Sequence, residues 1–210
     1  MNASAGGVYQ STLTQPGDYI FKDINGDGKI TTLDRGPIGD INPDYFGGWN
    51  NTVTYKNWDF TMNWNFSHGA QRQYEKISNL YYTDAITNPT PEVFDTWTPE
   101  NPNASYARYA SPTHGYTATS RSVVDASYIK LRSASIGYNL PSSLFKNTGL
   151  SKVRLSLSGN NLITITDYPG LDPEDVISTS FANRTTGFTR DGGNSYPNVR
   201  TFTFSLNVTF

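Results

Sequence analysis

The sequence contains no cysteine, which excludes disulfide bonds, thiolate metal sites and cysteine nucleophiles. It has no apolar run long enough for a transmembrane helix, which takes about 18 residues or more. Neither sign of charge is in excess, because 16 Lys and Arg nearly balance 18 Asp and Glu. The basic residues are scattered, so the composition predicts no nucleic-acid partner and no polybasic membrane-surface patch.

Several functional signatures are also missing. The first ten residues, MNASAGGVYQ, have neither the basic nor the apolar region of a signal peptide. We therefore expect either a cytoplasmic protein or a piece of a longer gene product. There is no Walker loop, no G-x-S-x-G turn and no H-E-x-x-H helix. The histidines, His68 and His114, are far apart in sequence. The sequence predicts no enzyme, with no catalytic and no cofactor-binding residues.

Aromatic residues and glycine are abundant, with 14 Tyr, 11 Phe, 4 Trp and 18 Gly. This composition favours β-strands over helices. Five segments have the pattern of strands: 45–55, 58–68, 127–140, 153–165 and 201–210. Each is about as long as the 9–11 residues with which a tilted strand crosses a bilayer. The sequence therefore predicts an all-β chain of about five strands.

Most of these segments alternate between apolar and polar residues, as a strand with two different faces does. In 58–68 the apolar set is Trp58, Phe60, Met62, Trp64 and Phe66, and in 201–210 it is Phe202, Phe204, Leu206, Val208 and Phe210. Segment 45–55 follows the same pattern with Asn51 as an interruption, and 153–165 places Val153, Leu155 and Leu157 opposite polar residues. The faces of 127–140 are mixed, so its orientation stays open. The apolar faces suit either lipid or the core of a soluble β-sandwich.

The connections between these segments are unequal in length. A two-residue turn, Lys56-Asn57, and a short stretch at 141–152 alternate with long connections at 69–126 and 166–196. Short turns at one end and long loops at the other are typical of outer-membrane barrels. Trp58, Trp64 and Phe210 favour lipid, because aromatic residues gather at both membrane interfaces. The alternative is a soluble, calcium-stabilised β-sandwich that binds carbohydrate at a cell surface; an accessory domain of a glycoside hydrolase is a further alternative.

Five stretches, in order along the chain, resemble segments of SusC/RagA-type TonB-dependent transporters. They are FKDINGDGKITTLDRGPIGDINPDYFGGWNNTVTYKNWDF (21–60), DTWTPENPNA (95–104), DASYIKLRSASIGYNLP (125–141), SGNNLITITDYPGLDPE (158–174) and YPNVRTFTFSLNVTF (196–210). The resemblance covers roughly residues 18–210. It implies that the strands form an antiparallel meander, the C-terminal part of a 22-stranded outer-membrane β-barrel with long extracellular loops.

The resemblance also implies a function. It predicts that residues 1–210 are the C-terminal fragment of a transporter whose plug and first barrel strands lie elsewhere, since five strands alone would leave unpaired edges in lipid. The expected location is the outer membrane, in contact with its lipid. The expected activity is import of oligosaccharides or peptides, with a SusD-like surface lipoprotein as partner and energy from the TonB complex through the absent N-terminal part.

The segment DINGDGKITTLD (23–34) has the spacing of a twelve-residue calcium loop. The predicted ligands are Asp23, Asn25, Asp27, Lys29 through its carbonyl, Thr31 and Asp34. Gly28 stands where the loop turns sharply, and Asp34 replaces the usual Glu with a shorter side chain. The alternative is a pair of Asx-Gly turns without metal. We expect Ca²⁺, if bound, to stiffen an outer loop.

The long connection at 69–126 contains six aromatic residues that are candidates for contact with substrate or partner: Tyr81, Tyr82, Trp97, Tyr106, Tyr109 and Tyr116. Exposed aromatic rings at a barrel mouth stack on sugars or pack against a partner protein. Their alternative role is to pack the loop on itself. Asp172 and Glu174 are close enough for a pair of catalytic carboxylates, but a structural turn is the favoured interpretation.

Overall fold

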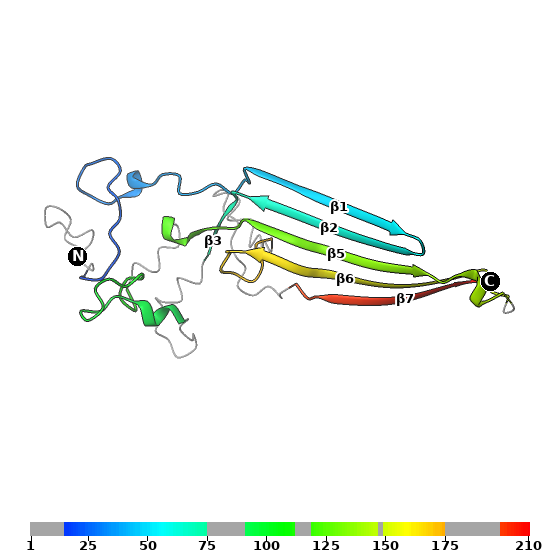
Figure 1. Cartoon of the computed structure of the whole chain (residues 1–210). Coiled ribbons are helices and arrows are strands. Elements are labelled where there is room, and N and C mark those ends of the chain that lie inside the picture. The colour runs from blue at the N-terminus through cyan, green and yellow to red at the C-terminus, as the bar shows by residue number, and fades with distance from the viewer. Residues whose placement is uncertain (1–14, 75–90, 112–118, 147–148, 175–197) are drawn as a thin grey trace. The chain divides into compact units, whose positions relative to one another are not determined.

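The structure is a computed structural model that describes residues 15–74, 91–111, 119–146, 149–174 and 198–210 (Figure 1). These residues form two units. The first comprises the described residues of Met1–Gly39 and Arg72–Val124, and the second those of Asp40–Gln71, Asp125–Val176 and Asn194–Phe210. Each unit is described by itself. No helix in the described ranges is long and apolar enough to span a bilayer.

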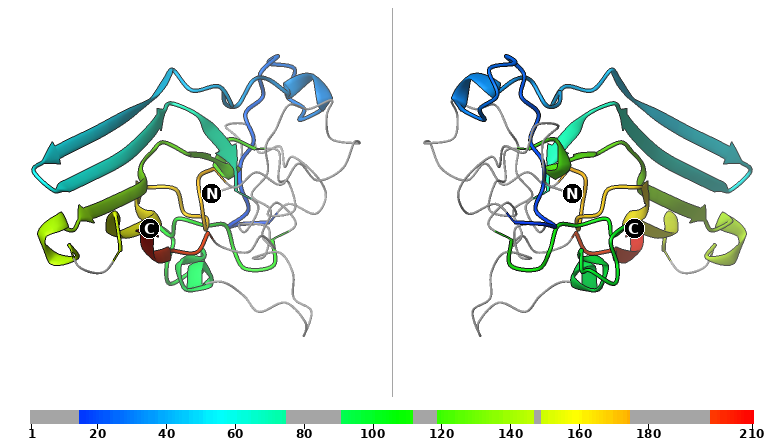
Figure 2. Two further views of the ribbon diagram at one scale, coloured as in Figure 1. Left: turned by 90° about the vertical axis from the view of Figure 1, so that its right-hand side faces the viewer. Right: turned by 90° about the vertical axis from the view of Figure 1, so that its left-hand side faces the viewer.

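The second unit is an antiparallel sheet with the strand order β1-β2-β5-β6-β7 (Figure 1). Its strands are β1 (Tyr45–Tyr55), β2 (Trp58–His68), β5 (Tyr128–Asn139), β6 (Lys152–Thr166) and β7 (Thr201–Thr209). Neighbours in the sheet follow one another in sequence, apart from the short strands β3 and β4, so the predicted five-stranded meander is confirmed. Figure 2 shows that the sheet is curved. The Greek-key crossing of a sandwich is absent from these five strands.

The remaining elements are short. β3 (Gln71–Gln73) pairs with β4 (Val123–Asp125) in a separate two-stranded sheet. The described residues also contain the 3₁₀ turns η1 (Thr32–Asp34), η3 (Pro91–Asp95), η5 (Ser120–Ser122) and η6 (Ser142–Leu144). The sequence predicts neither β3 nor β4, because a strand of three residues is too short to show an alternating pattern.

The strand register places the apolar side chains of all five strands on one face, which we call the outer face. One row across the sheet is Val53, Phe60, Ile136, Leu157 and Phe204, and the next is Tyr55, Trp58, Tyr138, Leu155 and Leu206. Val53, Leu157 and Phe204 are about half exposed or more. The predicted sharing of a face by the aromatic residues of β2 and β7 is therefore confirmed.

The opposite, inner face is polar except in its last row, where Phe46 and Tyr128 lie on either side of Ser67. Its central row is Thr52, Thr61, Ser135, Ser158 and Thr203, and Asn63, Asn65 and Ser205 lie on the same face. From the pair Tyr45 and His68 to the pair Tyr55 and Trp58 the outer face runs ten residues. Ten steps of about 3.3 Å along a strand tilted by about 40° span roughly 25 Å, the height of the apolar band of an outer-membrane barrel.

A β-bulge at Arg132 explains why the faces of 127–140 are mixed in the sequence. Leu131 pairs with Trp64 and Ser133 pairs with Asn63, so Arg132 is an extra residue in β5. The extra residue shifts the alternation by one position. Before the bulge Ile129 lies on the outer face, and after it the residues of even number do. The bulge therefore lets Lys130, Arg132 and Ser133 all lie on the inner side.

Candidate functional site

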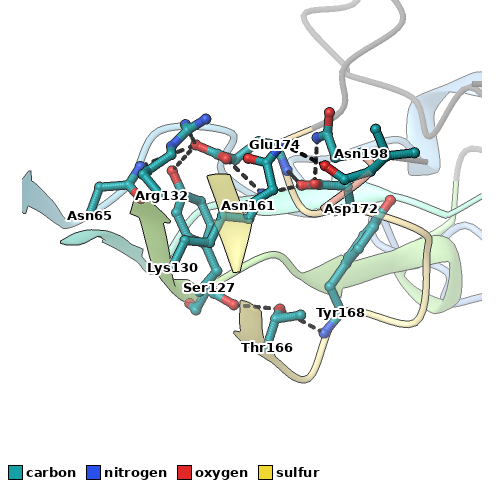
Figure 3. A network of polar contacts seen from close by, with 12 residues as sticks. Asn65, Ser127, Lys130, Arg132, Asn161, Thr166, Tyr168, Asp172, Glu174 and Asn198 are labelled. Atoms are coloured by element: carbon teal, nitrogen blue, oxygen red, sulfur yellow. Dashed lines mark hydrogen bonds and ion pairs between the residues drawn. The ribbon is translucent and has the colours of Figure 1, made fainter. Parts of the chain in front are cut away.

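A cluster of four charged side chains lies on the inner face of β5, near the end of the sheet where the long connections begin (Figure 3). Lys130 Nζ lies 2.5 Å from Asp172 Oδ1 and 2.7 Å from Glu174 Oε2. The fourth member is Arg132, whose Nη2 donates to Glu174 Oε1. The cluster brings together residues about 40 apart in sequence and carries no net charge.

Neutral side chains also donate hydrogen bonds to the two carboxylates. The Tyr128 hydroxyl donates to Glu174 Oε1 at 2.6 Å, and Asn198 Nδ2 donates to Asp172 Oδ2 at 2.7 Å. Asn65 on β2 accepts from Arg132 Nε at 3.2 Å in the amide orientation that satisfies both side chains. The side chains of Lys130 and Asp172 are each only 6% exposed, so their charges depend on one another rather than on water.

The segment that brings Asp172 and Glu174 to the cluster has a defined local structure. Thr166, the last residue of β6, donates through its hydroxyl to the Ser127 carbonyl at 2.7 Å, and the same oxygen accepts from Tyr168 N. The Glu174 amide donates to Asp172 Oδ1 at 2.8 Å, which is an Asx turn. Tyr168 and Pro173 are both buried. The favoured interpretation of Asp172 and Glu174 as a structural turn fits this geometry. Both carboxylates form ion pairs with Lys130 or Arg132, and they do not face each other across a cavity that could hold a substrate.

The pKa values of Asp172 and Glu174 reflect two opposed effects. Burial raises both pKa values, but hydrogen bonds from Lys130, supplemented by Asn198 and Tyr128, outweigh burial and hold both below their ordinary values of 3.8 and 4.5. Both carboxylates are therefore ionised at neutral pH. A group with a lowered native pKa stabilises the fold above its ordinary pKa, and this contribution is lost as the pH falls through the native pKa.

Acid is accordingly expected to release the segment 167–174. Its amide protection factors should stay constant from pH 7 to about pH 5 and fall between about pH 5 and pH 2. Hydrogen exchange of the whole protein in detergent, measured by mass spectrometry, provides these factors. The amides of β6 serve as the control and should stay protected. Protection of 167–174 that is independent of pH across this range would contradict the assignment.

A second ion pair lies on the inner face toward the end with the short turns. Arg154 on β6 and Asp59 on β2 form two contacts, Nη1 to Oδ1 at 2.5 Å and Nη2 to Oδ2 at 2.7 Å. The pair crosses the intervening strand β5 directly above Gly137, where a Cβ atom would lie 2.2 Å from Arg154 Nη2 and 2.8 Å from Asp59 Oδ1. Position 137 therefore has to be glycine for this three-strand bridge to form.

The loop aromatics predicted from sequence lie in the first unit where they are described. Trp97 packs on the backbone of Gly17, with ring atoms 2.3–2.9 Å from where a Cβ would be. The Tyr106 ring lies 5.8 Å from the Arg121 guanidinium, and burial raises the pKa of its hydroxyl. Tyr109 is 38% exposed. Tyr81, Tyr82 and Tyr116 lie outside the described residues. Contact of any of the six with substrate stays a prediction.

The predicted calcium loop is held by its own turns. Asp23 accepts from the amides of Gly26 and Gly28, both at 2.7 Å, and these two glycines have φ of 75° and 79°. Asp34 accepts from Thr31 N at 2.6 Å, which is the first cause of a lowered pKa at Asp34.

The donor set of this loop fits calcium in kind, since carboxylate, amide and carbonyl oxygens at this spacing are its usual ligands. The arrangement is that of Asx turns, with Asp27 accepting from Lys29 N at 2.8 Å. Within the described residues no three His, Cys, Asp or Glu side chains are gathered as a metal site. Binding of calcium by Asp23, Asn25, Asp27, Lys29, Thr31 and Asp34 stays a prediction.

Sequence comparison places this architecture in a family. No protein-family model matches the chain. TonB-dependent receptor P3 of Formosa agariphila is 42% identical over 216 residues, which cover 97% of this chain and 21% of the relative. TonB-dependent receptor SusC of Bacteroides thetaiotaomicron is 27% identical over 97% of this chain. The chain is homologous to TonB-dependent receptors, SusC among them. It spans about a fifth of the length of these curated relatives.

Solved structures agree on the fold of this TonB-dependent receptor segment. The RagAB peptide importer in its open-open state superimposes with a TM-score of 0.65 over 82% of this chain and 18% of that chain, at 22% identity. The closed-closed state gives 0.66 over 91% of this chain and 21% of that chain, at 20% identity. The five-stranded sheet is consistent with a fragment of a TonB-dependent receptor barrel, as predicted. That it is the C-terminal fragment stays a prediction.

Proposed function

We propose that this chain is a sector of the barrel wall of an outer-membrane transporter that imports oligosaccharides or peptides. The observation that supports the proposal most is the separation of the two faces of the sheet. Apolar residues of all five strands share the outer face, and hydroxyl, amide and charged side chains cover most of the inner face. Such a sheet suits lipid on one side and a hydrated passage on the other.

The same proposal includes partners. A SusD-like surface lipoprotein covers the mouth, and the TonB complex supplies energy through a part of the protein outside this chain. The partnership draws support from the relative SusC and from the structural similarity to the RagAB peptide importer.

Deletion of the whole gene in its natural host is expected to abolish uptake of one member of a panel of labelled oligosaccharides and tryptic peptides. Complementation with the full gene should restore it, and a protonophore should abolish it again, because the TonB complex depends on the proton gradient. Uptake of a sugar that enters through general porins serves as the control. Unchanged uptake across the whole panel would contradict the proposed function.

The loop at 23–34 is proposed to bind a structural calcium ion. Asp27→Ala removes the ligand predicted at the centre of the loop, so calcium binding to the whole receptor should weaken at least tenfold. Calorimetry with calcium chloride measures the binding, and near-native protection of the sheet amides shows that the fold is intact. No calorimetric signal from this loop at millimolar calcium in the unmodified receptor would leave only the Asx-turn interpretation.

A further inference from the structure

The segment Asp167–Glu174 lies on the inner side of the sheet and is held at both of its ends. At its start the Thr166 hydroxyl joins the Ser127 carbonyl at 2.7 Å to the Tyr168 amide at 3.1 Å. At its end Asp172 and Glu174 are bound to side chains of β5 and to Asn198 (Figure 3). A segment that is attached at one end only can move as a lid. Within the described residues, this segment is attached to the sheet at both ends.

The interior of the segment is packed as firmly as its ends. Pro173, between the two acidic residues, is less than 2% exposed, and Tyr168 is 5% exposed. Leu171, by contrast, is 53% exposed on the other side of the turn. Positions 171 and 173, two residues apart, therefore differ sharply in exposure.

Lys130 carries most of the cost of opening. Its ammonium group serves both carboxylates and lies 5.3 Å from the centre of the Tyr128 ring. Its side chain is 6% exposed. Separation would break the charge-assisted hydrogen bonds from this one ammonium group to two carboxylates, which are stronger than hydrogen bonds between neutral groups.

We propose that Lys130 closes a permanent latch that makes Asp167–Glu174 a fixed part of the inner wall of the barrel, not a lid that opens as cargo passes. Arg132 and Asn65 are then held in fixed positions beside the segment, and the Arg132 side chain, 45% exposed, faces the interior. The latch follows from the geometry of this chain, and its behaviour during import rests on the proposed function.

The latch is tested by the reactivity of a buried cysteine in the whole receptor, located by peptide mapping. In Pro173→Cys, maleimide should react at least 100-fold more slowly than in Leu171→Cys, because position 173 is reached only when the segment opens. Adding Lys130→Met to Pro173→Cys should raise the rate about 100-fold or more. Adding Lys152→Met, the same change at an exposed lysine at the other end of the same face, should leave the rate unchanged.

Transport separates a fixed wall from a lid. In energised cells supplied with the imported substrate, the Pro173→Cys rate should equal the rate in cells treated with a protonophore. A higher rate during import would overturn the proposal, as would an unchanged rate in the Lys130→Met variant. Hydrogen exchange of 168–174 in the unmodified receptor and in Lys130→Met gives the same comparison without a cysteine. The purified-protein experiments decide the latch even if no import is found.

Discussion

Arginine in place of Ala134 is expected to destabilise the assembled barrel by about 2–4 kcal/mol, the cost of a cation on the lipid face near the middle of the bilayer. Ala134 lies in the central row of the outer face, between Met62 on β2 and Gly159 on β6. Leu162 and Phe202 lie close over Gly159, so Ala134→Met at the same position separates the cost of the charge from the cost of crowding. Urea unfolding of the whole receptor in lipid vesicles measures both costs.

The adjacent residue provides the control. Ser135 is nearly the same size as Ala134 but lies on the inner face, between Thr61 and Ser158. Ser135→Arg should cost less than about 1 kcal/mol, because a guanidinium there meets hydroxyl groups and water. Equal costs at the two positions would contradict the assignment of the faces.

Methionine in place of Lys130 is expected to destabilise the receptor by about 3–5 kcal/mol, because it leaves the buried Asp172 without a cation and Glu174 with Arg132 alone. The combined variant Lys130→Met, Asp172→Asn, Glu174→Gln removes all three charges together. It should be less destabilised than the single variant, although it lacks more interactions, since the one charge left in the cluster is that of Arg132, whose side chain is 45% exposed to water. Unfolding in denaturant, followed by the loss of the heat-resistant folded band on a gel, gives the ranking.

Lys152→Met provides the matched substitution at an exposed site and should change the unfolding free energy by less than about 0.5 kcal/mol. If the triple variant were less stable than Lys130→Met alone, the charges would not be coupled as the distances indicate. A single variant as stable as the unmodified receptor would show that the segment is held by packing of Tyr168 and Pro173 instead.

The strands and their faces were predictable wherever alternation is unbroken. β1 and β2 begin and end at the predicted residues, and β7 follows its pattern from Thr201 to Thr209. β5 could not be oriented from sequence, because the bulge at Arg132 shifts the apolar set from odd to even positions. A bulge changes which residues pair across the strands but does not change the composition of the strand. The sequence therefore indicated a strand at this place but not which of its faces is the outer one.

The acidic residues of the charged cluster could be predicted from the sequence, but their cation could not. Asp172-Pro173-Glu174 has the composition of a turn, and the structure places it in one. Its cation could not be assigned, because Lys130 is 42 residues away and the pairing depends on where the segment after β6 folds back. The signal available was the presence of Lys130 and Arg132 in a strand that otherwise has no charge. Such residues need partners when they lie on a partly covered face.

The ion pair above Gly137 had no signal in the sequence at all. Asp59 and Arg154 are 95 residues apart, on strands that are not neighbours, and the glycine between them is one of 18 in the chain. Its role depends on the register of three strands, which the turn at Lys56 and the bulge at Arg132 fix together. Pattern and composition define the strands, whereas only register defines which side chains meet across them.

Spin labels at two adjacent positions test whether the outer face of this sheet meets lipid and the inner face lines the barrel interior. Ala134→Cys and Ser135→Cys are labelled in the whole receptor and reconstituted in bilayers. The label at 134 should collide readily with oxygen, which concentrates in lipid, and poorly with a water-soluble nickel complex. The label at 135 should be shielded from lipid. Equal accessibility at both positions, or a reversed order, would contradict it.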